Sequence, residues 1–180
     1  MIQRIQSVWL ALAVLCMALC FMFPVAQYHL SKPDTQQHVE ARLDLVAKDN
    51  PDMWNQLQNM ESEIDYSQKA SGFHTWPLLA LALLTMAVAV GAVLLFGNRV
   101  RQMRIVAVAF LLNVVYVFLV FFWAVDSYGN EVSRVMEATD MQVAWHVGAY
   151  APIVSLVFFI LAHRAIKRDE AKVRAADRLR

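Results

Sequence analysis

The sequence predicts an all-α protein: a four-helix transmembrane bundle with a short helical extracytoplasmic loop region and a cytoplasmic C-terminal helix extension. Of its 180 residues, 59% are apolar and 17% are charged, whereas soluble domains average roughly 45–50% apolar and about 25% charged residues. Four uncharged stretches each approach the roughly 20 residues with which a helix crosses a bilayer. The 16 basic and 15 acidic residues nearly balance, so a nucleic-acid partner is not expected.

The whole chain is expected to form a single membrane domain. In chain order it consists of a span at 8–26, an outer loop at 27–75, a span at 76–97, an inner loop at 98–104, a span at 105–125, an outer loop at 126–142, a span at 143–162 and a cytoplasmic tail at 163–180. The first stretch resembles a signal peptide, but its length and the lack of an A-x-A-like site favour a retained span.

The distribution of basic residues predicts the orientation. Arg4, the three arginines of 98–104 and seven basic residues of 163–180 make up 11 of the 16 basic residues. Both termini are therefore expected in the cytoplasm of a bacterium, with the protein in the inner membrane. Tryptophans at the outer span ends fit this frame: Trp76, Trp123 and Trp145. The basic residues predict contact with anionic lipid headgroups at the cytoplasmic face.

The segments outside the membrane are expected to be helical. Val39, Leu43 and Val46 have helical spacing, and a second helix is expected to start at Asn50 and Pro51. These helices form either a lid on the spans or a docking face for a periplasmic protein. A turn is expected at 128–130, with a short helix after it. The tail is expected to continue the fourth span as a helix, its acidic residues facing the inner-loop arginines.

Within the spans the polar residues are few, and none near a span centre is charged, which argues against a proton-coupled transporter. Thr85, Tyr150 and Ser155 are expected to contribute inter-helix hydrogen bonds. Cys16 and Cys20 are expected to be apolar fillers. No catalytic, cofactor-binding or metal-binding residues are predicted. The candidate interaction or structural residues are Arg4, Arg99, Arg101, Arg104, Asn113, Tyr116, His146, Asp169, Glu170, Asp177 and Arg178.

Several fragments together resemble one family. They include the opening MIQRIQSVWLALA, then FPVAQY, TWPLLAL, GNRVRQMR, the LN of the third span, GAYAPI, and the ending LAHRAIKRDEAKVRAADRLR. This set resembles the four-span membrane proteins of Bacteroidota that are classed as a domain of unknown function. The resemblance covers essentially the whole chain and is weakest in the 27–75 loop. It implies the four-helix inner-membrane architecture and no established activity.

The leading functional hypothesis is an inner-membrane protein without catalytic activity, acting as an accessory or interaction subunit for a membrane or periplasmic protein partner. The alternative is a small transporter or channel whose path is lined by polar residues of spans two to four: Thr85, Asn113, Tyr116 and Ser155. A polar cavity at membrane depth would favour the alternative, and a dry apolar bundle with a wide apolar patch outside the membrane would favour the first hypothesis.

Overall fold

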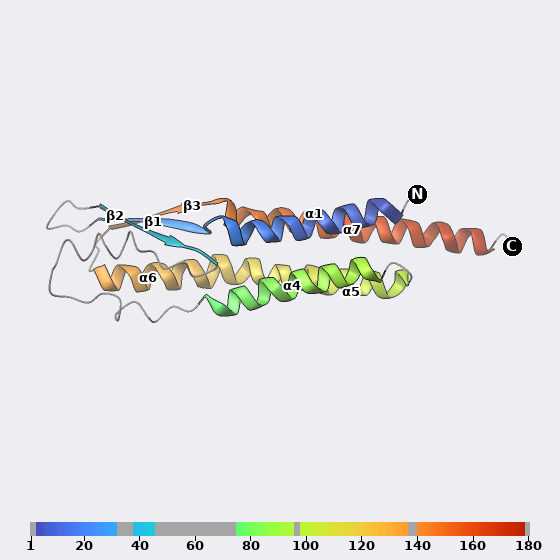
Figure 1. The fold of residues 1–180 in the computed structure, drawn as a ribbon, viewed down its shortest axis with the longest axis horizontal. Helices are drawn as coiled ribbons and strands as arrows, with labels where there is room; N and C mark the ends of the chain where they lie inside the picture. The colour runs from blue at the N-terminus through green and yellow to red at the C-terminus, as the bar shows by residue number, and fades with distance from the viewer. Residues whose placement is uncertain (1–2, 32–37, 46–74, 96–97, 137–139, 179–180) are drawn as a thin grey trace. The chain divides into compact units, whose positions relative to one another are not determined.

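The computed structural model describes residues 3–31, 38–45, 75–95, 98–136 and 140–178 (Figure 1). Within these ranges the elements are α1 (Gln3–Met22), β1 (Ala26–Ser31), β2 (His38–Leu43), α4 (Trp76–Leu94), α5 (Arg99–Leu119), η1 (Val120–Ala124), α6 (Val125–Met136), β3 (Asp140–Trp145) and α7 (Val147–Arg178). The short element η1 is a π-helical turn, in which backbone hydrogen bonds skip five residues. Both of its flanking residues keep right-handed helical dihedrals, so α5, η1 and α6 form one unbroken helix.

Four helical stretches are long and apolar enough to cross a membrane, which confirms the predicted fold class at the level of four candidate spans. They are Ile5–Met22, Trp76–Leu94, Arg99–Arg134 and Val147–Ala175. Large apolar side chains remain exposed along these helices, as they do where lipid is the surrounding medium. The chain is therefore built as a multi-pass membrane protein.

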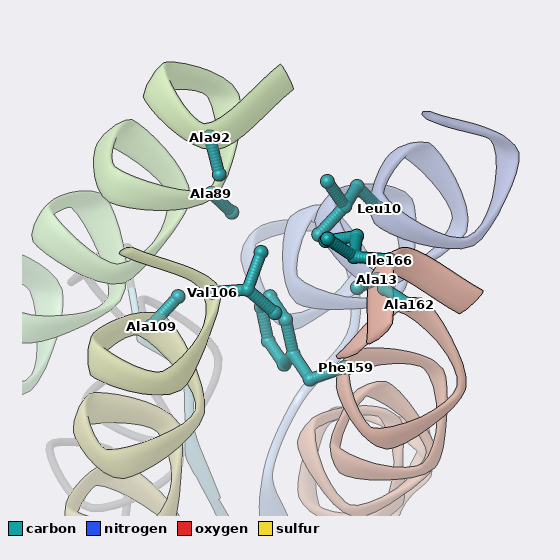
Figure 2. Close-up of a cluster of buried hydrophobic side chains, with 9 residues drawn as sticks. All are labelled: Leu10, Ala13, Ala89, Ala92, Val106, Ala109, Phe159, Ala162 and Ile166. Atoms are coloured by element: carbon teal, nitrogen blue, oxygen red, sulfur yellow. The ribbon is translucent and has the colours of Figure 1, made fainter. Parts of the chain in front are cut away.

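The described chain divides into two compact units. Unit 1 comprises residues 1–19, 80–117 and 150–180 and contains segments of α1, α4, α5 and α7. Small residues and a few large ones from all four helices form its buried cluster (Figure 2), which consists of Leu10, Ala13, Ala89, Ala92, Val106, Ala109, Phe159, Ala162 and Ile166. Alanine at five of these nine positions lets the helices approach closely, so that van der Waals packing can hold them together without a hydrophobic drive between helices.

Contacts within unit 1 also fix the direction of the helices. The side-chain nitrogen Nε2 of Gln6 lies 3.5 Å from the carbonyl oxygen of Ala165, and the rings of Trp9 and Phe158 stack with centroids 5.9 Å apart. Rising residue numbers on α1 thus meet falling numbers on α7, so the two helices are antiparallel. The first turns of α1 lie beside the later part of α7.

Unit 2 comprises residues 20–79 and 118–149. Its centre is a three-stranded antiparallel sheet with the strand order β2-β1-β3. Ala26 of β1 pairs with Leu43 of β2 on one side and with Trp145 of β3 on the other. Because side chains alternate along a strand, one sheet face carries mostly apolar residues and the opposite face carries mostly polar ones.

The sheet corrects the prediction of a helical first outer loop. Residues 38–43 form a strand, in which the apolar residues Val39, Ala41 and Leu43 repeat every second position. The prediction of a helix relied instead on the spacing of Val39, Leu43 and Val46, and it is wrong for this segment. The second predicted amphipathic helix, from Asn50, lies outside the described residues.

Three further boundaries differ from the predictions. The first helix ends at Met22 rather than residue 26, because the following residues turn into β1. Residues 143–145 belong to β3 rather than to the fourth span, whose helix begins at Val147. The turn predicted at 128–130 is wrong, since these residues are helical within α6. Gly129 serves close packing there: an added Cβ would lie 3.0 Å from a Tyr28 ring carbon.

Candidate functional site

Two polar side chains within the spans of unit 1, those of Asn113 and Ser155, meet at the contact of α5 with α7. The amide nitrogen Nδ2 of Asn113 donates to the carbonyl oxygen of Pro152 at 3.1 Å and to the hydroxyl of Ser155. That hydroxyl in turn donates to the same Pro152 oxygen at 2.7 Å. All three residues are buried. The Asn113 amide thus donates to a backbone and a side-chain oxygen of the neighbouring helix, and the Ser155 hydroxyl donates within its own helix.

Two more predicted polar residues are buried in the same unit. Thr85 donates its hydroxyl to the carbonyl oxygen of Leu81, four residues earlier in its own helix, at 2.8 Å. Tyr116 is completely buried one turn along α5 from Asn113. The other amide atom of Asn113, Oδ1, is buried and accepts no hydrogen bond from the described residues. A buried acceptor of this kind is costly unless a water or ligand reaches it.

Two of the predicted charged residues, Arg99 and Asp169, meet where the start of α5 contacts the later part of α7. The Nε atom of Arg99 lies 3.2 Å from Oδ2 of Asp169, and its Nη1 lies 3.4 Å from the Asp169 carbonyl oxygen. The Asp169 carboxylate is largely buried, so a nearby cation offsets much of its desolvation. Glu170 instead pairs with Arg174, one turn further along α7. Of the predicted acidic residues, Asp169 therefore faces the inner-loop arginines and Glu170 does not.

The other charged candidates occupy separate positions. The backbone nitrogen of Arg101 lies 3.3 Å from the side-chain oxygen of Asn98, which caps the start of α5. The side chains of Arg101 and Arg104 are exposed. For Arg4, Asp177 and Arg178, the structure describes only a helical backbone.

His146 belongs to unit 2 and lies between β3 and α7 rather than inside a helical span. Its ring atom Nε2 is 2.8 Å from the side-chain oxygen of Gln27, and its backbone nitrogen donates to Val25. Gly148 follows closely, with its nitrogen 3.1 Å from the carbonyl oxygen of Pro24. These bonds fasten the segment that enters α7 to the segment that leaves α1.

A second buried polar arrangement, which sequence reasoning missed, joins the sheet to α6. The Tyr28 hydroxyl donates to the Val125 carbonyl oxygen at 2.8 Å in a buried bond, and the Tyr128 hydroxyl donates to the backbone carbonyl oxygen of Arg42 at 3.0 Å in an exposed one. The two tyrosine rings lie 5.4 Å apart. Burial raises the pKa of the Tyr28 hydroxyl above its ordinary value, and Tyr128 and Asp126 raise it further. The alternation of Ala26, Tyr28 and Leu30 was the available signal, because it marks a strand with one apolar face.

Within the described ranges, no three His, Cys, Asp or Glu side chains come close enough to hold a metal ion. Cys20 is buried and Cys16 is partly buried. The described arrangement can therefore hold helices and strands together through hydrogen bonds and one half-buried ion pair, and its charged end can attract anions.

Comparison with known protein families identifies the family of the chain. A family model described as a domain of unknown function (DUF4293) matches residues 2–179. A search of the curated proteins finds no match to the chain. The family expected from the sequence is thereby confirmed as one of unknown function, while the Bacteroidota origin stays a prediction.

Proposed function

Since the chain belongs to the DUF4293 family, a domain of unknown function, we propose its role from its own residues: a non-catalytic accessory or interaction subunit of the bacterial inner membrane. Both termini lie in the cytoplasm in this proposal, and unit 2 lies outside it. The partner is a membrane or periplasmic protein that docks on unit 2.

The observation that carries this proposal is which groups the polar side chains in the spans bond to. Both hydrogen bonds that the Asn113 amide donates end on α7, at Pro152 and Ser155, and the Thr85 hydroxyl donates to its own helix. A transporter needs such groups to face a passing solute, whereas these groups bind the protein itself. Hydrogen bonding of this kind supports a structural role for the spans and moves the functional surface outside them.

The polar face of the sheet is the proposed docking surface. Along β1 and its two neighbours, the side chains of His29, Arg42 and Gln142 are exposed and stand on one face by strand alternation. Gln27 on the same face is partly buried by its bond to His146. These exposed polar side chains leave this face of the sheet open to a partner protein.

Site-specific photo-crosslinking in living cells tests this proposal. A photoreactive amino acid at position 142 should give a discrete protein adduct of higher mass, whereas the same amino acid at Leu83, an exposed position on α4, should give none. Equal adduct patterns at both positions, or no protein adduct at Gln142, would contradict the docking proposal.

One observation favours the alternative of a small transporter or channel. Oδ1 of Asn113, which accepts no hydrogen bond from the described part of the chain, offers an acceptor at the level of the spans, where a water or a solute group could bind. Vesicles containing the purified protein test this alternative. Solute entry that depends on Asn113 would support it, whereas vesicles as tight as protein-free ones would leave the interaction role.

A further inference from the structure

An elongated groove runs between α5 and α7 in unit 1. Its volume is about 300 Å³, at the lower end of the range for ligand pockets. Val106 and Phe159 are completely or almost completely buried and form its floor. Both also belong to the buried cluster in Figure 2, where their side chains point toward one another. Because this floor is part of the packed core, the groove has a fixed shape.

The sides of the groove are apolar and one end is cationic. Ala107, Phe110 and Ile160 line the sides of the groove, while His163 and Arg164 lie at the end of the groove nearer the C-terminus of α7. The groove therefore changes along its length from a purely apolar surface to one with positive charge. A lipid molecule has the same sequence of properties, from acyl chain to phosphate.

The register of the two helices adds further cations at this end. Arg99 lies opposite Asp169 and Asn113 lies opposite Ser155, so α5 and α7 are antiparallel with equal steps. Counting five residues inward from the Arg99–Asp169 pair brings Arg104 level with Arg164.

Helical spacing places two further cations beside this end of the groove. Arg104 precedes the lining residue Ala107 by three positions and so borders the Ala107 edge of the groove, whereas Lys167 follows His163 by four and Arg164 by three and so lies on the groove face of α7.

These cations have no ionic partner among the described residues. The described carboxylates nearby are engaged elsewhere, Asp169 by Arg99 and Glu170 by Arg174. The side chains of Arg104, Arg164 and Lys167 are all exposed and form no ion pair with any described residue. Three cations around one end of an apolar groove need an anion with an apolar body.

We propose that this groove is a specific binding site for an anionic glycerophospholipid of the surrounding membrane. One acyl chain lies along Ala107, Phe110 and Ile160, and the phosphodiester meets Arg164 together with Arg104. The His163 ring, half-buried in the wall, borders the glycerol region. The proposal goes beyond the accessory role above and does not rest on it.

The two parts of the site contribute differently. Moving an acyl chain from bilayer to groove gains little from the hydrophobic effect, because lipid tails are as apolar as the groove. The groove therefore selects by shape and holds the chain in place. The charged end supplies affinity and the preference for anionic headgroups, since each basic residue near the surface attracts them.

Lipid binding is measured by native mass spectrometry on the purified full chain. The probes are phosphatidylglycerol and phosphatidylcholine with identical acyl chains, and glycerol phosphate serves as a soluble competitor. We expect the wild-type protein to retain phosphatidylglycerol in preference to phosphatidylcholine. Displacement of the lipid by glycerol phosphate alone would show a free-phosphate site and would overturn the proposal.

The headgroup part is tested with Arg164→Gln and the matched control Arg101→Gln. Arg101 is an exposed arginine at the same end of α5, but it precedes the lining residue Phe110 by nine positions, two and a half helical turns, and so lies on the opposite side of α5. Arg164→Gln should weaken retention of phosphatidylglycerol about fivefold, which corresponds to roughly 1 kcal/mol. Arg101→Gln should leave it unchanged. Equal weakening by both variants would mean general surface attraction and would overturn the site.

The acyl-chain part is tested with Ala107→Phe and the matched control Ala87→Phe. The first substitution fills the groove without changing the charge, and the second adds the same ring at an exposed alanine of α4. Ala107→Phe should abolish retention of both lipids, and Ala87→Phe should not. If Ala107→Phe unfolds the protein, Ala107→Leu replaces it, with the thermal midpoint checked. Full retention by a folded groove-filling variant would overturn the proposal.

Discussion

Asn113 shows how a single polar residue can be accommodated in the middle of an apolar helix. Pro152 on α7 has no N–H to donate to the carbonyl oxygen of Gly148, four residues earlier. The amide of Asn113 does not replace that bond but donates across the helix contact, to the carbonyl oxygen of Pro152 itself and to the Ser155 hydroxyl beside it. The side chain of Asn113 therefore fixes the contact of α5 with α7 at the proline.

Replacing Asn113 by leucine tests how much this contact contributes. Asn113→Leu removes both donated bonds but also removes the buried, unpartnered Oδ1, and hydrogen bonds between membrane helices average about 0.6 kcal/mol. We expect a loss of unfolding free energy of no more than about 1–2 kcal/mol, measured by reversible unfolding in detergent. Val114→Leu, on the exposed side of the same helix, is the control. Complete loss of function in a normally expressed Asn113→Leu protein would favour the transporter alternative.

Tyr28 gives a prediction for alkaline pH. Its folded pKa is raised, so the folded state favours the protonated hydroxyl, and this contribution is fully present below the unfolded pKa near 10. It is lost as the pH rises above that value.

Tyr28→Phe should therefore lower the free energy of unfolding by about 0.5–1.5 kcal/mol at neutral pH, because the bond to Val125 is lost. Between about pH 9 and about pH 11, the free energy of unfolding should fall less in this variant than in the wild type, because the variant has no Tyr28 hydroxyl to ionise. Thermal unfolding across this range measures the difference, with the exposed Tyr150→Phe as the control. An unchanged alkaline slope in Tyr28→Phe would show that other groups determine it.

At the scale of single elements, the long helices were predictable and the short strands were not. A run of about 20 apolar residues has few alternatives to a membrane helix. The strands are six residues each, and the apolar residues of β3 continue directly from the apolar fourth span, so composition could not separate Trp145 from Val147. The paired strands are distant in sequence, so the only local signal of each strand was the alternation of its side chains at every second residue.

The charged end was predictable in part for a similar reason. Opposite charges at the ends of antiparallel neighbours suggested that α7 would turn acidic residues toward α5, and Asp169 does so. The choice of Asp169 over Glu170 depends on the rotation of α7 about its axis, which packing against the cluster fixes. The groove between α5 and α7 depends on the same packing and had no sequence signal.

Two glycines in helices predict opposite outcomes. A Cβ on Gly148 would lie 2.5 Å from the carbonyl oxygen of Pro24, whereas one on Gly91 would meet nothing within 4 Å. Gly148→Ala should destabilise the protein by about 1–3 kcal/mol or more through overpacking against rigid backbone. Gly91→Ala should be neutral or stabilise it by up to about 1 kcal/mol. Thermal midpoints of the two purified variants measure this, and similar midpoints would contradict the close approach at Gly148.

Removing the last residues of α7 tests what orients the chain. Deletion of residues 175–180 leaves Arg164, Lys167 and Arg168 in place and does not reach the Arg99–Asp169 pair. We expect unchanged insertion of all spans, because basic residues close to a span determine its orientation. Accessibility of introduced cysteines to a membrane-impermeant reagent measures this. An inverted last helix would assign the orienting signal to the deleted residues.

At the scale of the whole molecule, strand pairing constrains the topology without reference to charge. The central strand β1 follows α1 and hydrogen-bonds with β3, which precedes α7. Strands cannot pair across a bilayer, so the segments after α1 and before α7 must share one side of the membrane. Between these two segments the chain crosses the membrane twice, through α4 and through the helix that begins with α5, and so returns to the same side.

Reporter fusions assign that shared side to a compartment. An alkaline phosphatase fused within residues 44–63 should be active, because the enzyme folds only outside the cytoplasm, and fusions after Gly97 or Arg180 should be inactive. A cytoplasmic fluorescent reporter at the same three positions is the control and should give the opposite pattern. Activity of the phosphatase after Arg180 would contradict cytoplasmic termini.

The sheet order β2-β1-β3 also has a consequence in time. Residues 32–139 separate β1 from β3, so at about 5–20 residues per second a newly made β1 waits on the order of 5–20 s before β3 exists. During that interval one edge of β1 has no strand beside it, while two further helices are made and enter the membrane. The final strand therefore closes the sheet only late in synthesis, and a chain stopped before Asp140 keeps an open edge that other strands can join.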